Sequence, residues 1–302
     1  MKHAFRIIGV VLATALAGGC YEPPVQEEPP PMWYFHNGPT NSHHYDIASA
    51  ARNDVWAVGE TDQGKAEVIH FVAYDWQPVS LPEAMTSPLY AVTVTPGGDV
   101  WVAGAGEDFW RWNGNNWEAW PRSSSENAVY GLAMPKDDAG WAVGAGGAIW
   151  EFDGSSWTRV PSPVTSNLRR VRALSDASAW AVGDDGAVLR YDGTGWVNLS
   201  FSPSVDMRDA YFAAEDDGWV VGSLASLYHW DGETFKKYAS PDADINYRCC
   251  GFATSALGWA GGDQMRIARY HDDRWTIEEY LPSGVWNLSL IHISEPTRLL
   301  SI

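Results

Sequence analysis

The sequence predicts an all-β protein, a β-propeller of four-stranded antiparallel blades. Three observations predict this fold. A Trp-x-x-Gly motif recurs six times, at intervals of 39 to 45 residues. A second aromatic residue follows each motif tryptophan, sixteen residues later in five of the six repeats. Asn-Gly or Asp-Gly precedes that aromatic residue in four repeats. A period of about forty residues with such marks is typical of propeller blades.

Each repeat is expected to be one meander of four strands, a to d. The motif tryptophans are Trp56, Trp101, Trp141, Trp180, Trp219 and Trp259. The second aromatic residues are Trp76, Trp117, Trp157, Trp196, Phe235 and Trp275. In the fourth repeat we expect strand a around Val171 and the later strands over 179–182, 188–191 and 196–199. The Asp-Gly pair between strands c and d is a strong hairpin signal, because a type I′ turn needs positive φ at both central positions. The large aromatic residues need neighbouring blades to bury them, so the blades must close into a ring.

The N-terminal end predicts how the ring closes. Trp33 precedes Trp56 by 23 residues, as Trp157 precedes Trp180. Residues 32–38 are therefore predicted to be a lone d strand that completes the last blade, whose other strands come from the C-terminal end. Six whole repeats and this shared one make seven blades, or eight if more of the chain is missing.

The C-terminal end is predicted to leave the closing blade incomplete. Residues 281–286 begin a further strand a on schedule, but residues 288–298 read LSLIHISEPTR. That peptide resembles the translation of a library adapter used in DNA sequencing. We therefore expect the propeller to span 32–287 and residues 288–302 not to be genuine protein. The alternative is a natural hydrophobic tail.

The N-terminus has the pattern of an export signal. Residues 1–19 combine basic Lys2 and Arg6 with an apolar run over 7–17 that is too short to span a bilayer. Small residues leading into Cys20 resemble a bacterial lipoprotein signal, which implies that Cys20 carries lipid. Residues 20–31, rich in proline, are expected to be a tether. The resemblance implies a lipid anchor in the bacterial cell envelope, with the outer membrane or periplasm favoured because Tyr21 follows Cys20. The alternative is ordinary secretion.

Composition limits the size of the fold and the partners. With 302 residues, 45% of them hydrophobic, the chain can bury one large core, and a single ring counts as one domain. Its formal net charge of −18 repels phosphate, which makes nucleic acid an unlikely partner. The same charge repels anionic headgroups, so we expect contact with a membrane only through the lipid on Cys20. We expect a monomer when the ring is intact.

One position in the repeat predicts a binding surface. The residues eleven before the motif tryptophans are Tyr45, Tyr90, Tyr130, Arg169, Arg208 and Arg248. They begin the innermost strands, so we expect them around the mouth of the axial channel, on the face of the b–c and d–a loops, with Arg170 and Arg172 adding charge. Guanidinium groups suit a carboxylate, sulfate or acidic peptide, and tyrosines stack on sugars or aromatic side chains. The alternative is that these side chains cover blade edges.

Two further groups have both a functional and a structural interpretation. The b–c loops carry carboxylates that can bind Ca²⁺ if they converge, or simply form solvated turns. They include Asp62, Asp108, Asp184 and Asp263. Adjacent Cys249 and Cys250 can form a vicinal disulfide in an oxidising compartment. Two buried thiols are favoured instead, because neighbouring side chains on a strand point to opposite faces.

The repeat units resemble a known family. AGWAVG over 139–144, AWAVG over 179–183 and GWVVG over 218–222 are similar to the photosystem II assembly-factor-like and BNR-type repeats of the WD40/YVTN-like propellers. The resemblance covers residues 32–287 and implies the fold rather than a function. Assembly-factor relatives hold a partner protein with an arginine patch, which implies such a role for Arg169, Arg208 and Arg248.

The function predicted from the sequence is a non-catalytic binding scaffold for a protein or glycan. The sequence has no Gly-x-Ser-x-Gly, no His-Glu-x-x-His and no phosphate-binding glycine loop. The alternative is a sialidase-like glycoside hydrolase acting on an acidic sugar, which needs a tyrosine nucleophile paired with a glutamate. The sequence places no glutamate evidently beside Tyr45, Tyr90 or Tyr130. No cofactor is expected apart from the calcium ion considered above.

Overall fold

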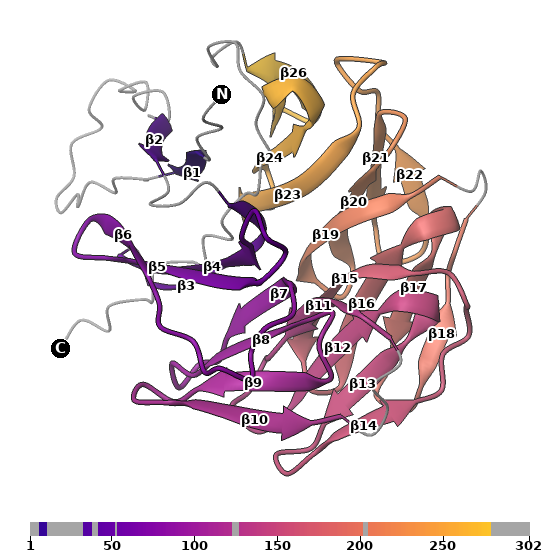
Figure 1. Ribbon diagram of the computed structural model, residues 1–302. Helices are drawn as coiled ribbons and strands as arrows, with labels where there is room; N and C mark the ends of the chain where they lie inside the picture. The colour runs from indigo at the N-terminus through magenta and orange to yellow at the C-terminus, as the bar shows by residue number, and fades with distance from the viewer. Residues whose placement is uncertain are drawn as a thin grey trace, which may run out of the picture.

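The fold is a β-propeller. The computed structural model describes residues 6–10, 33–37, 42–51, 53–122, 127–201 and 205–278. The described residues form six four-stranded antiparallel sheets, each made of strands consecutive in sequence, and a separate two-stranded sheet. The six sheets are arranged as blades around a centre where their first strands lie (Figure 1). The all-β propeller prediction is confirmed with six blades in the described part, and a seventh is not seen there.

The first three blades occupy residues 43–160. Blade one comprises β3 (His43–Ala51), β4 (Asp54–Glu60), β5 (Ala66–Val72) and β6 (Asp75–Pro78). Blade two comprises β7 (Leu89–Val94), β8 (Val100–Gly104), β9 (Asp108–Trp112) and β10 (Trp117–Pro121). Blade three comprises β11 (Val129–Ala133), β12 (Gly140–Gly144), β13 (Ile149–Phe152) and β14 (Trp157–Val160).

The next three blades occupy residues 168–278. Blade four comprises β15 (Leu168–Ser175), β16 (Ser178–Gly183), β17 (Val188–Tyr191) and β18 (Trp196–Asn198). Blade five comprises β19 (Met207–Ala214), β20 (Asp217–Gly222), β21 (Ser226–Trp230) and β22 (Phe235–Lys237). Blade six comprises β23 (Tyr247–Thr254), β24 (Leu257–Gly262), β25 (Ile267–His271) and β26 (Arg274–Glu278). Short 3₁₀ turns join strands b and c in three blades: η1 (Ala145–Gly147), η2 (Asp184–Gly186) and η3 (Asp263–Met265).

The motif tryptophans hold the blades together. Each is at most 5% exposed, and five of the six lie in an apolar cluster shared with the following blade. Trp180 of blade four, for example, stacks on Phe212 of blade five with ring centroids 4.2 Å apart. Because a buried indole removes roughly 150–250 Å² from water, one such residue per interface explains why the period of the motif sets the period of the fold.

The motif glycine permits the close approach of strand b to the start of strand a. A Cβ on Gly183 would lie 2.0 Å from the carbonyl oxygen of Asn167, and one on Gly222 would lie 2.1 Å from that of Asp206. Any larger residue would therefore push the two strands apart at the point where the inner strand begins. The same point carries the candidate site described below.

Among the described residues, blades six and one share no apolar cluster, unlike the other pairs of neighbouring blades. Blade six presents Trp259 and Ile267 on that side, whereas blade one presents Ile69, Phe71 and Trp76. The two-stranded sheet of β1 (Arg6–Val10) and β2 (Trp33–Asn37) lies between β6 and β26 (Figure 1). A strand is found where one was predicted at 32–38, as β2, but it is not a lone d strand, because it pairs with β1. The strands expected to receive it would follow residue 278, outside the described residues.

Two further features bear on the sequence predictions. No helix among the described residues is long and apolar enough to cross a membrane. Cys249 and Cys250 are both buried and no disulfide joins them, as the favoured alternative predicted. Cys249 lies with Trp259 on one face of blade six, and Cys250 packs in the cluster with blade five.

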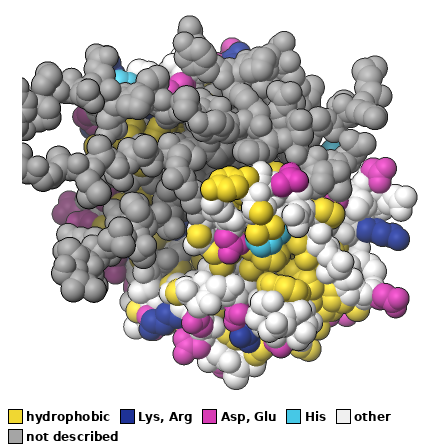
Figure 2. Space-filling view, turned by 90° about the vertical axis from the view of Figure 1, so that its left-hand side faces the viewer, with side chains coloured by type: hydrophobic (Ala, Val, Ile, Leu, Met, Phe, Trp, Pro, Cys, Tyr) yellow, Lys and Arg dark blue, Asp and Glu magenta, His cyan; other side chains and the backbone are white. Residues whose placement is uncertain are grey.

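The outer surface mixes apolar and charged side chains. Trp112 and Trp117 of blade two are only half-buried at the edge of their cluster. On the side of the molecule seen in Figure 2, hydrophobic side chains gather on the described surface, with acidic and basic side chains interspersed around them. This rim differs from the end of the propeller described next, where polar contacts repeat from blade to blade.

Candidate functional site

A β-bulge at the start of each inner strand builds the candidate site. In all six blades the register between strands a and b shifts by one residue there, leaving one extra residue on strand a. The extra residues are Tyr45, Tyr90, Tyr130, Arg169, Arg208 and Arg248, which we call the Tyr–Arg arc. A bulge re-aims the side chain of its extra residue, so one backbone device presents all six side chains at the same end of the propeller.

The tyrosines of the arc form a continuous row of rings. Tyr45 and Tyr90 meet edge to face with centroids 5.2 Å apart, and Tyr90 and Tyr130 are 5.8 Å apart. The row continues into the arginines, because the guanidinium of Arg169 lies 4.8 Å from the ring centroid of Tyr130. Such edge contacts and the cation–π contact are favourable geometries for these groups.

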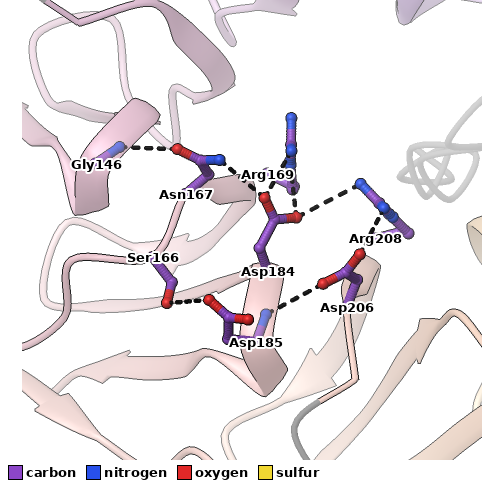
Figure 3. Close-up of polar contacts among 8 residues, drawn as sticks. All are labelled: Gly146, Ser166, Asn167, Arg169, Asp184, Asp185, Asp206 and Arg208. Atoms are coloured by element: carbon purple, nitrogen blue, oxygen red, sulfur yellow. Dashed lines mark hydrogen bonds and ion pairs between the residues drawn. The ribbon is translucent and has the colours of Figure 1, made fainter.

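The arginines of the arc are bound by carboxylates of the b–c turns. Arg169 binds Asp184 through two hydrogen bonds, Nε to Oδ1 at 2.9 Å and Nη2 to Oδ2 at 2.6 Å. Arg208 reaches the same Asp184 at 3.5 Å and donates to Asp206 at 2.8 Å (Figure 3). Arg248 donates from Nε to Oδ1 of Asp263 at 2.5 Å. The positive charge of this half is therefore largely neutralised within the chain.

Side chains just before the inner strands link neighbouring blades. Asn167 accepts from the backbone N–H of Gly146 in the preceding blade and donates to Asp184 in its own (Figure 3). Asn246 does the same between Leu224 and Asp263. These bonds fix the carboxylates that bind the arginines, so the arginine half of the arc consists of two hydrogen-bonded groups, one around Asp184 and one around Asp263.

Burial and hydrogen bonding shift the pKa values of the groups around the arc. Burial works against ionisation of Asp184, but hydrogen bonds from Arg169 and Asn167 prevail and hold its pKa below the ordinary value. The pKa of Asp263 is lowered in the same way, against burial, by Asn246 and Arg248. At the other half, burial and then the hydrogen bond to Glu60 raise the pKa of Tyr45. Both carboxylates therefore stay ionised and Tyr45 stays neutral at pH 7.

Glu60 is the carboxylate of the tyrosine half. It accepts a hydrogen bond at 2.5 Å from the hydroxyl of Tyr45 through Oε1. From the sequence no glutamate was evident beside an arc tyrosine, but Glu60 lies beside Tyr45 in the structure. Tyr45 and Glu60 are fifteen residues apart, as are Arg169 and Asp184, and Arg248 and Asp263. This constant offset would have identified the three pairs.

Arg170 and Arg172 do not add charge to the arc, contrary to the prediction. Arg170 lies on the axis and binds Asp46 of blade one at 2.7 Å and Asp209 of blade five at 3.2 Å. Arg172 binds Asp209 and the carbonyl of Ala210. Asp46 and Asp209 are at most 4% exposed and also accept the backbone N–H groups of Val92 and Cys250. We call Asp46, Arg170, Arg172 and Asp209 the axial network.

The axial network also follows the repeat. The residues ten before the motif tryptophans are Asp46, Ala91, Gly131, Arg170, Asp209 and Cys249. They follow the arc residues directly, and successive residues on a strand point to opposite sides. Asp46 and Asp209 were not predicted from the sequence, although each directly follows an arc residue.

The predicted calcium ligands do not come together in the described residues. No three His, Cys, Asp or Glu side chains of the described ranges are grouped as a metal ion requires. Asp184 and Asp263 are bound by arginine and asparagine instead. Asp62 and Asp108 lie in different blades and contribute to no such group in the described part of the chain.

Residues 73–192 match the family described as photosynthesis system II assembly factor YCF48. These residues, which span strand d of blade one to strand c of blade four, are similar to that family. The resemblance drawn from the Trp-x-x-Gly repeats is thereby confirmed. A search of curated protein sequences finds no match.

Solved structures support the propeller fold. A structure titled "YCF48 bound to D1 peptide" has a TM-score of 0.67 at 14% identity, over 83% of this chain and 86% of that one. YCF48 from Cyanidioschyzon merolae has a TM-score of 0.65 at 17% identity, over 82% and 88%. The WD40 repeats of RRP9 have a TM-score of 0.67 at 10% identity, over 83% and 84%. At these identities the similarity shows the fold alone.

Proposed function

We propose that this chain is a non-catalytic cell-envelope lipoprotein whose propeller holds a segment of a partner protein on the Tyr–Arg arc. The observation that carries the proposal is the arc itself. Six bulges present three phenol rings and three guanidinium groups at one end of the molecule. Aromatic and arginine side chains are the types enriched where proteins bind one another. The YCF48 structure solved with a D1 peptide supports a protein partner for a related propeller.

The proposal includes a seventh blade in the intact protein. Blade six carries an apolar cluster with Trp259 and blade one carries an apolar cluster with Phe71. A further blade between them would bury both clusters and close the ring. β2 lies on that side, against a strand of the region predicted to be removed as a signal peptide. Removal of residues 1–19 would free β2 to pair with a closing blade.

The envelope location is proposed from Cys20 and the residues around it. Metabolic labelling with an alkyne fatty acid in a bacterial host tests it. The intact chain should take up label and fractionate with membranes, whereas Cys20→Ala should do neither. Labelling that survives this substitution would refute the lipoprotein assignment and leave the binding function of the propeller to be tested separately.

The binding function is tested by selection from a random peptide display library and, in parallel, on a glycan array. We expect peptides to be enriched and their binding to be lost in Arg169→Ala and Arg208→Ala variants that still unfold cooperatively. Lys136→Ala is the matched control. Lys136 is 53% exposed and pairs with Asp176 in the a–b turns of the opposite face. Binding to glycans alone would indicate a glycan ligand instead of a protein. An equal loss of peptide binding in Lys136→Ala would show that the arc is not the binding surface.

One contact favours a second candidate, a sialidase-like hydrolase acting on an acidic sugar. The Tyr45–Glu60 hydrogen bond has the pairing that a tyrosine nucleophile needs. Burial and Glu60 raise the pKa of Tyr45, however, and the arc arginines are already bound to Asp184 and Asp263. Hydrolysis of a fluorogenic sialoside by the intact chain, absent in Tyr45→Phe, would establish this activity. If no fluorophore is released above background, the hydrolase hypothesis is wrong.

A further inference from the structure

The tyrosine half of the arc carries an unbalanced negative charge. Glu60 is half-buried, and its Oε1 is taken by the hydroxyl of Tyr45. No protein donor reaches its Oε2 within the described residues. Lys65, exposed in the same b–c loop, forms no ion pair in that part of the chain. Each arginine of the opposite half has a carboxylate partner, whereas no ion pair of Glu60 is found among the residues that the structure describes.

The two rings beside Glu60 are both accessible to solvent in part. Tyr45 is 42% exposed, and Tyr90 is half-buried against it. Burial and then the charge of Glu60 raise the pKa of Tyr90, so the carboxylate acts on both rings. Two phenol faces with a carboxylate at their edge are the groups that bind an alkylammonium or guanidinium ion.

The protein already uses the same row in this way. Arg169 lies over Tyr130 at 4.8 Å while a carboxylate, Asp184, holds the guanidinium from its other side. Tyr130 and Tyr45 occupy the same bulge position two blades apart. The chain thus contains one complete tyrosine–cation–carboxylate unit and one that lacks only the cation.

Arg122 and Arg111, two arginines of the tyrosine half, are engaged elsewhere in the described part of the chain. Arg122 is 9% exposed and donates to the carbonyl oxygens of Gly106, Glu107 and Asn127. Arg111 is bound to Asp99, 2.5 Å away, in the a–b turn of blade two on the opposite face. The net charge of −18 also attracts cationic groups in general.

We propose that Tyr45, Tyr90 and Glu60 form a subsite for one lysine or arginine side chain of the bound segment. The proposal rests on the proposed binding function and names a feature of the partner. The partner segment carries a basic side chain that lies over the two rings and pairs with Glu60. The rest of the segment extends toward the arginine half.

The test uses the intact chain with ring-labelled tyrosine, titrated with Nα-acetyl-lysine methylamide and observed by NMR. Nα-acetyl-norleucine methylamide is the neutral control of similar length. We expect the resonances of Tyr45 and Tyr90, assigned with Tyr→Phe variants, to shift with the lysine compound at a millimolar dissociation constant. Tyr74, 75% exposed in a turn on the opposite face, should not shift.

Glu60→Gln provides the decisive variant, because its amide oxygen can still accept from Tyr45 while the charge is gone. We expect this variant to bind the lysine compound about tenfold more weakly, a difference of about 1.4 kcal/mol. Equal shifts with norleucine, or unchanged affinity in Glu60→Gln, would overturn the subsite.

The peptide selection separates this inference from the function on which it rests. Selected peptides enriched in one lysine or arginine, with weaker binding to Glu60→Gln, support both. Selected peptides that need Arg169 but contain no enriched basic residue overturn the subsite and leave the binding function standing. A lysine response without any selected peptide supports the subsite while contradicting peptide binding by the arc.

Discussion

The two halves of the Tyr–Arg arc are built on the same β-bulge but are stabilised by different interactions. In blades one to three the bulge residues are tyrosines that pack on one another, with Glu60 as the carboxylate fifteen residues on. In blades four to six they are arginines, bound through Asp184, Asp206 and Asp263. One half is held by ring contacts and the other by charge.

This difference changes what the arc is expected to recognise. The three guanidinium groups were expected to make an anion site in an acidic protein. Their in-chain partners neutralise most of that charge, so an anionic ligand must compete with Asp184 and Asp263. The uncompensated charge lies in the tyrosine half instead, at Glu60. The arc therefore presents two unlike ends to a bound segment, which favours one direction of binding.

Breaking the link between the halves is expected to have the largest effect. Arg170 joins blade four to Asp46 of blade one and Asp209 of blade five inside the propeller. Arg170→Met removes the cation that binds buried Asp46 and leaves buried Asp209 with Arg172 alone, so it should lower the free energy of unfolding by about 3–5 kcal/mol. Urea denaturation measures this free energy of unfolding. Asp46→Asn and Asp209→Asn added to Arg170→Met should restore part of the loss, whereas a single variant as stable as the parent would contradict the role of the axial network.

The arginine half should loosen first in acid. The lowered pKa values of Asp184 and Asp263 stabilise the fold above the ordinary carboxyl pKa of about 3.9. This stabilisation is lost as pH falls through the lower folded values. Asp184→Asn should cost about 1–3 kcal/mol at pH 7 and flatten the fall in unfolding free energy below about pH 4.

Asp176→Asn is the control for that experiment. Asp176 is 48% exposed on the opposite face, where its contact with Lys136 is screened by solvent. Its effect at pH 7 should be smaller than that of Asp184→Asn. Equal effects would show that the network at the arc contributes no more than an exposed ion pair.

The fold was predictable from the sequence because its cause is local and repeated. The tryptophan that packs on the next blade and the glycine that admits strand a stand at fixed positions in every repeat. Strands predicted at 179–182 and 188–191 are found as Ser178–Gly183 and Val188–Tyr191. The same period located all six arc residues at their bulges.

The partners of those residues were harder to predict because they depend on contacts between blades. For Asp184 the sequence left open a calcium ligand or a solvated turn, and neither interpretation included its contacts with Arg169 and Arg208. Arg170 was placed beside Arg169 because they are adjacent in sequence. Successive side chains on a strand point to opposite sides, so Arg169 lies in the arc while Arg170 points into the propeller. There Arg170 binds Asp46, which is 124 residues away in the sequence.

The tyrosine half should respond to alkali rather than acid. Burial, first of all, and the charge of Glu60 raise the pKa values of Tyr45 and Tyr90. Because the pKa of each tyrosine is higher in the folded than in the unfolded chain, its neutral form stabilises the fold. This stabilisation is complete below the ordinary pKa of about 10 and is lost as the pH rises through the pKa of the folded state. Ultraviolet titration of tyrosine should therefore show late-ionising residues, fewer in Tyr45→Phe. A titration unchanged by this substitution would contradict the assignment.

Removing single hydroxyl groups is expected to have the smallest effect and gives the finest comparison within the tyrosine half. Tyr45 donates to Glu60 at 2.5 Å, so Tyr45→Phe should lower the free energy of unfolding by at most about 1 kcal/mol, because the pair is exposed. Tyr90→Phe keeps both ring contacts and should change it by less than about 0.5 kcal/mol. Thermal unfolding of both variants measures the difference. A larger loss in Tyr90→Phe would mean that its hydroxyl, rather than its ring, fixes the row, and the tyrosine half would then be held by polar contacts like its counterpart.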